Sequence, residues 1–127
     1  MKLKSFFLVN ALMFIPFGTG MLLMPLFIFK MLDVNLDADG LLMASTVGSL
    51  LLSFGVLSYF SRNLDIYSAG VKAILIANLL FHIIDCFLTF KGAYTGVMNS
   101  FGYLFSTLHF LFALGFAYYL SIHIKSK

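Results

Sequence analysis

Charged residues are scarce in this sequence: 8 Lys and Arg and 5 Asp and Glu make up 10% of its 127 residues. A soluble domain carries roughly 25% charged residues, so this chain has too few to cover a water-facing surface. Hydrophobic residues make up 61% of the chain, and its mean hydropathy is +1.02. Composition therefore indicates a membrane protein.

Cysteine is nearly absent, because Cys86 is the single one. It excludes an intrachain disulfide and a redox mechanism that needs two cysteines. The basic residues form no patch with interleaved aromatic residues, so we expect no nucleic-acid partner. The chain also lacks a Walker loop and a nucleophile with a base beside it, so we expect neither nucleotide nor hydrolytic chemistry.

Four apolar runs are present instead, over residues 5–29, 40–61, 67–90 and 99–122. Each is long enough to cross a hydrocarbon core of about 30 Å at about 1.5 Å per residue. The first run continues past residue 20 without a small-x-small cleavage site, so we expect an uncleaved helix rather than a signal peptide. Short connections favour antiparallel neighbours. We therefore expect an all-α fold with one domain over residues 1–127, an integral membrane antiparallel four-helix bundle.

The basic residues predict the orientation of the bundle, because loops rich in Lys and Arg stay in the cytoplasm. With the N-terminus inside, the outer side holds only Lys30 and Lys91. The inner side holds six basic residues: Lys2, Lys4, Arg62, Lys72, Lys125 and Lys127. We therefore expect both termini in the cytoplasm and a multi-pass protein of the bacterial inner (cytoplasmic) membrane.

Three loop aspartates, Asp33, Asp37 and Asp39, then face outward. We expect a solvated loop that caps the second helix, with a divalent cation site as the alternative. In the first run, Pro16 and Pro25 predict a kink near mid-membrane.

Small residues form stripes that predict helix packing. Ala44, Gly48 and Gly55 share one stripe of the second run, and Gly102 lies on a similar face of the fourth. Small residues at helical spacing let membrane helices approach closely. The stripe of the second run fits packing within the bundle, or an interface with a second copy or a membrane-protein partner.

A polar stripe interrupts the third run. At about 100° per residue, Asn78, His82, Asp85 and Thr89 fall within a sector about 60° wide, and Cys86 lies at its edge. An ionised Asp in the bilayer core costs about 2.5–3.5 kcal/mol. We therefore expect Asp85 to face the bundle and to be paired or protonated.

The fourth run offers a partner face of Gly102, Ser106, His109 and Ala113. Counting from the outer helix ends places His82 and His109 at similar depth, with Asp85 one turn nearer the outside, level with Ser106 and Tyr103. A hydrogen bond from Asp85 to His82 or to His109 is therefore expected.

Three interpretations of the polar stripe remain open. It is structural, holding the third helix to the fourth, or it is a proton or ligand site. That site would comprise Asn78, His82, Asp85 and His109, with Thr89, Tyr103 and Ser106 around them. The third is haem or metal ligation, for which His82, Asp85, Cys86 and His109 are weak candidates. We expect no cofactor.

The chain also resembles the small four-helix bacterial membrane proteins of unknown function. The resemblance rests on Pro25-Leu26 closing the first helix, the acidic loop, the glycines Gly48 and Gly55, and Ser61-Arg62-Asn63. Members often carry a basic residue early in the second helix, where this chain has Ser45 and Thr46. The resemblance implies no established activity and assigns no catalytic residue.

The function expected first is that of a non-enzymatic accessory or interaction protein in the lipid bilayer. The alternatives are a small transporter or proton-coupled carrier, and a membrane haem or metal protein.

Overall fold

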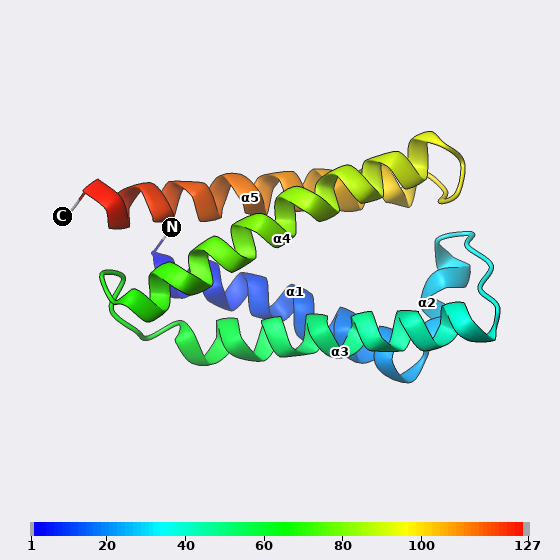
Figure 1. Cartoon of the computed structure of the whole chain (residues 1–127), viewed down its shortest axis with the longest axis horizontal. Coiled ribbons are helices and arrows are strands. Elements are labelled where there is room, and N and C mark those ends of the chain that lie inside the picture. Colours follow the sequence, from blue (N-terminus) through cyan, green and yellow to red (C-terminus); the bar gives the residue numbers. More distant parts are fainter. Residues whose placement is uncertain (1, 126–127) are drawn as a thin grey trace.

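A computed structural model describes residues 2–125, which form five helices and no strands (Figure 1). The helices are α1 (Leu3–Leu23), α2 (Pro25–Met31), α3 (Ala38–Ser61), α4 (Ala69–Tyr94) and α5 (Phe101–Lys125). All except α2 are long and apolar enough to cross a membrane. Lys127, which contributed to the predicted orientation, lies outside the described residues.

The first apolar run is divided into two helices at Met24, where the expected single span over residues 5–29 does not continue. Met24 has φ −139° and ψ 53°, outside the helical region. The cause is Pro25, which disfavours a helical conformation in the residue before it and has no N–H of its own. Pro16, by contrast, lies inside α1 without ending it. The first helix therefore ends near the end of the run, just before Pro25.

Polar side chains begin two of the long helices. Asp37 accepts a hydrogen bond from the Gly40 N–H at 2.8 Å, and Ser68 accepts one from the Val71 N–H at 3.2 Å. Each side chain satisfies a backbone donor that has no partner within its helix. The acidic loop thus caps α3 through Asp37, as expected.

The long helices pack in two pairs, α1 with α3 and α4 with α5, and the N- and C-termini lie at the same end (Figure 1). Glycine allows the close approach within the first pair. A Cβ on Gly48 would meet backbone atoms of Met21 and Leu22, and one on Gly55 would meet Ile15. Ala44 is buried on the same stripe. The small residues of α3 therefore face α1 within the molecule.

Gly102 has the corresponding position in the second pair, because a Cβ there would meet Ala93 and the Thr89 carbonyl. A buried apolar cluster joins α1, α4 and α5. It comprises Phe6, Phe7, Val71, Leu75, Phe112, Phe116 and Tyr119.

At the opposite end the two interhelical loops are joined by hydrogen bonds. The Asn99 N–H donates to the Leu32 carbonyl at 2.9 Å, and the Asn99 side-chain amide donates to the Met31 carbonyl at 2.9 Å. On the outside, large apolar side chains are exposed, among them Leu12 (63%), Phe60 (73%) and Phe87 (71%). Such a surface suits a lipid environment.

Candidate functional site

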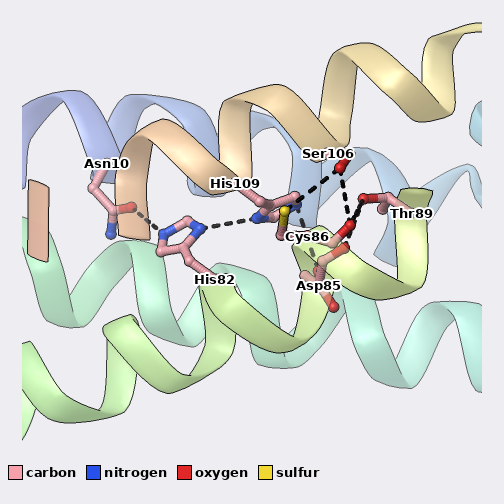
Figure 2. A network of polar contacts seen from close by, with 7 residues as sticks. All are labelled: Asn10, His82, Asp85, Cys86, Thr89, Ser106 and His109. Carbon is pink, nitrogen blue, oxygen red and sulfur yellow. Dashed lines mark hydrogen bonds and ion pairs between the residues drawn. The ribbon is translucent and has the colours of Figure 1, made fainter. Parts of the chain in front are cut away.

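A row of four polar side chains crosses the space between the helix pairs (Figure 2). Asn10 Oδ1 on α1 lies 3.1 Å from His82 Nε2 on α4. His82 Nδ1 lies 2.9 Å from His109 Nδ1 on α5, and His109 Nε2 lies 3.5 Å from Asp85 Oδ2. The polar stripe of α4 and the polar face of α5 are thus in direct contact, through His109.

The direction of these hydrogen bonds follows from one backbone carbonyl. Asn78 Nδ2 donates to the Ile74 carbonyl at 3.0 Å, which leaves Asn78 Oδ1 to accept from Asn10 Nδ2 at 3.1 Å. Asn10 Nδ2 also donates to Ser58 Oγ at 2.9 Å. Asn10 therefore turns its Oδ1 toward His82, and this oxygen can only accept.

His82 must consequently carry its proton on Nε2. The residue is fully buried, and a buried charge without a partner is costly, so the imidazole is neutral and its Nδ1 accepts. The facing Nδ1 of His109 must then donate. A single amide on α1 thus sets the tautomers of both histidines.

The contact between His109 and Asp85 has room for one further proton. With its Nδ1–H directed at His82, His109 presents Nε2 to the Asp85 carboxyl group. An unprotonated nitrogen and an ionised carboxylate would repel each other at this distance. A neutral Asp85 carboxyl group, whose O–H points at Nε2, removes this repulsion and leaves no charge in the pair.

Aromatic rings enclose His82 and exclude water from it. Phe14, Phe112 and Phe116 stack on the imidazole, with ring centroids 5.3, 5.0 and 5.4 Å away. Phe81 packs edge-on against both histidines. The protons of this row therefore exchange with the surroundings from the Asp85 end.

The geometry of the two histidines favours a hydrogen-bonded pair over a shared metal ion. Two Zn–N bonds of about 2.0–2.1 Å at a tetrahedral angle would hold the nitrogens about 3.3 Å apart, whereas they lie 2.9 Å apart. The remaining nitrogen of His82 is engaged by Asn10. Among residues 2–125, no three His, Cys, Asp or Glu side chains are grouped to hold a metal.

The neighbouring polar residues bond mainly to backbone. Thr89 Oγ1 donates to the Asp85 carbonyl at 2.6 Å, and Ser106 Oγ donates to the Cys86 carbonyl at 2.9 Å. The Cys86 thiol, 3.5 Å from the same hydroxyl, is then the donor to Ser106 Oγ. These bonds hold α5 against α4 next to the row.

Tyr103, expected at the level of Asp85, is turned away from the row. It is 43% exposed, and its ring packs edge-to-face on Phe90. Six residues of helix rotate a side chain by about 120° relative to His109, which directs Tyr103 outward, away from Asp85.

Sequence reasoning missed Asn10 and Ser58, both fully buried. Asn10 is an amide within an apolar run, as Asn78 is, but it has no polar neighbour at helical spacing that would mark it. His123 was missed as well: it is buried, and its Nδ1 donates to the Ile66 carbonyl at 2.6 Å. This bond ties the end of α5 to the loop before α4.

A cavity of about 360 Å³ lies beside Asp85 and His109, between the helix pairs. Its walls are mainly apolar, with Phe17, Phe29 and Phe105 among the lining residues. A smaller cavity of about 140 Å³ adjoins it and shares Asp85 and His109. The Asp85 side chain is 32% exposed and that of His109 11%, so the proton-holding pair borders a space large enough for a small molecule.

Comparisons with family models, with curated proteins and with solved structures each found no match for this chain. Its function is therefore inferred from the geometry of the site.

Proposed function

We propose that this chain is a multi-pass protein of the bacterial inner membrane, an antiparallel four-helix bundle with both termini in the cytoplasm. The bias of Lys and Arg toward the end that holds the termini supports this orientation. The exposed apolar side chains of the long helices support the membrane location.

Within that setting we propose a small proton-coupled carrier, which exchanges a small ligand against a proton held by Asp85 and His109. One observation carries this proposal: Asp85 and His109, whose side chains are close enough to share a proton, both line the cavity between the helix pairs. A ligand that enters the cavity meets the carboxyl group directly. Binding of the ligand and loss of the proton are therefore coupled.

The closed end of the row argues for exchange and against a proton channel. Beyond His82 the row continues into the amides of Asn10 and Asn78, and amides do not pass protons at ordinary pH. A proton that reaches His109 from the cavity must leave by the cavity. The site thus suits a carrier that binds and releases on one side at a time.

The small-residue stripes give less support to an accessory or interaction protein. Gly48 and Gly55 pack on α1, and Gly102 packs on α4, so these stripes are occupied within one molecule. Haem or metal ligation by His82 and His109 has less support too, because the two nitrogens are hydrogen-bonded to each other.

Infrared titration of the purified protein in detergent tests the proposal. We expect a carboxyl C=O band that is lost as the pH rises and that is missing in Asp85→Asn. Asp65→Asn, a change in the exposed loop before α4, is the matched control and should keep the band. A band that persists in Asp85→Asn, or a wild-type spectrum without any such band, would contradict the proposal.

A further inference from the structure

The side chains that line the cavity beside Asp85 restrict the class of ligand that it can bind. Its walls carry the aromatic rings of Phe17, Phe29 and Phe105 and the thioethers of Met21 and Met98. Aromatic faces and polarisable sulfur both favour an apolar body, and aromatic faces attract a cation as well.

Asp85 is the one acidic side chain among the residues that line this cavity, and neither Lys nor Arg is among them. Thr89 also borders the space, but its hydroxyl proton is already directed at the Asp85 carbonyl. The walls therefore offer an anion no cationic partner, and they offer a neutral polar molecule few donors. Charge complementarity selects a positive charge.

The titratable groups that face Asp85 come from two helices. His109 of α5 contacts the carboxyl group, and His82 of α4 contacts His109. The sides of the cavity formed by α1, α2 and α3 carry apolar side chains, among them Phe17, Ile28 and Leu51. The charge state of the cavity is thus decided by the Asp85–His109 pair.

The cavity has its rim on the side that faces lipid. Val47 of α3 and Leu88 of α4 both line it, and they are 44% and 59% exposed. At the loop end, Ile28, Phe29 and Leu32 cover it, held by the bonds from Asn99 to Met31 and Leu32. Entry between α3 and α4 suits a molecule that first partitions into the bilayer.

We propose that this cavity binds a small lipophilic organic cation, whose positive charge pairs with the Asp85 carboxylate and whose apolar body packs on Phe17, Phe29 and Phe105. This inference rests on the proposed carrier function and names its substrate class. A neutral Asp85 carboxyl group has no charge to offer, so the cation displaces the proton that the pair holds. The O–H bond of the carboxyl group breaks, the proton leaves to water, and one cation takes its place.

Isothermal titration calorimetry with benzyltrimethylammonium tests the proposal, since this quaternary cation carries no exchangeable proton. Its neutral isostere is neopentylbenzene, in which carbon replaces the charged nitrogen. We expect the purified wild-type protein to bind the cation about tenfold or more tightly than the isostere. Titrations in buffers of different ionisation enthalpy should show one proton released per cation, and binding should strengthen as the pH rises.

Asp85→Asn keeps the size of the side chain and removes its charge, so it should weaken cation binding about tenfold or more. Asp65→Asn is the control and should bind as the wild type does. If Asp85→Asn fails to fold, the comparison of cation and isostere on the wild-type protein still decides the matter.

Equal binding of the isostere would overturn the proposal, and would indicate an apolar cavity that does not recognise charge. Equal binding of the cation by Asp85→Asn would overturn it too. If the infrared titration detects a titrating Asp85 but the cation does not bind, only the substrate class fails. If Asp85 does not titrate at all, the carrier proposal itself fails.

Discussion

His82 Nδ1 and His109 Nδ1 lie 2.9 Å apart across the interface of α4 and α5. Only one of two facing nitrogens carries a proton in such a contact, so the two imidazoles hold opposite tautomers. Because His82 Nε2 must donate to Asn10, an amide on α1 determines the position of the His109 proton. That proton lies on Nδ1, so the Nε2 atom that faces Asp85 carries none. A change at Asn10 should therefore be felt at Asp85.

Asn10→Ala should destabilise the protein by about 1–3 kcal/mol, because it leaves buried groups of Asn78 and His82 without partners. Unfolding by denaturing detergent, followed by circular dichroism, measures the loss. Asn63→Ala, in an exposed loop, is the control and should change stability by less than about 0.5 kcal/mol. Equal losses in the two variants would show that the buried bonds of Asn10 contribute nothing.

His82→Phe should change the tautomer of His109. The phenyl ring keeps the packing against Phe14 and Phe112 but offers His109 Nδ1 no acceptor. Nitrogen-15 NMR of labelled histidine should find the His109 proton on Nδ1 in the wild type and on Nε2, directed at Asp85, in the variant. An unchanged Nδ1–H signal in His82→Phe would mean that His82 does not determine the tautomer.

Gly48→Ala should destabilise the pairing of α1 and α3 by about 1–3 kcal/mol, because its Cβ would meet backbone atoms that cannot move separately. Gly70→Ala is the matched control, since a Cβ there meets nothing within 4 Å. Thermal unfolding in detergent compares the two. The prediction fails if both alanine variants unfold at the wild-type temperature.

Asn99→Asp should loosen the closed end of the cavity. The new side chain still accepts from the Phe101 N–H, as Asn99 does at 3.1 Å, but it has no amide to donate to Met31. With Cys86→Ser as background, Met98→Cys places a thiol on the cavity wall. That thiol should react with a small alkylating reagent several-fold faster when Asn99→Asp is added. Identical rates would show that the bond to Met31 does not restrict access.

The proposed orientation predicts which loops react from outside the cell. In the Cys86→Ser background, Asn35→Cys in the exposed α2–α3 loop should react with a membrane-impermeant maleimide in intact spheroplasts. Asn63→Cys, in the exposed α3–α4 loop, should react only after lysis. The reverse labelling pattern would show that the bundle has the opposite orientation, with the Asn99 end of the cavity in the cytoplasm.

Sequence reasoning located the long helices and the polar faces of α4 and α5, because hydropathy and helical periodicity are local properties. It predicted a kink in the first run but not the end of a helix at Leu23, which Pro25 causes. It expected Tyr103 beside Asp85, whereas the ring is exposed and packs on Phe90. It missed Asn10 because no other polar residue lies three or four positions away from it in the sequence, so no polar helical face was visible there.

Hydropathy and periodicity thus suffice to decide that residues 2–125 contain four helices able to cross a membrane and that His82 and Asp85 share one helical face. They do not decide the partners across helices. Asp85 faces His109, and His82 lies between His109 and Asn10. Those contacts depend on how α1 pairs with α3 through Gly18 and Gly48, and on how the two pairs meet. Interhelical distances of this kind are set by side-chain packing between segments far apart in the chain.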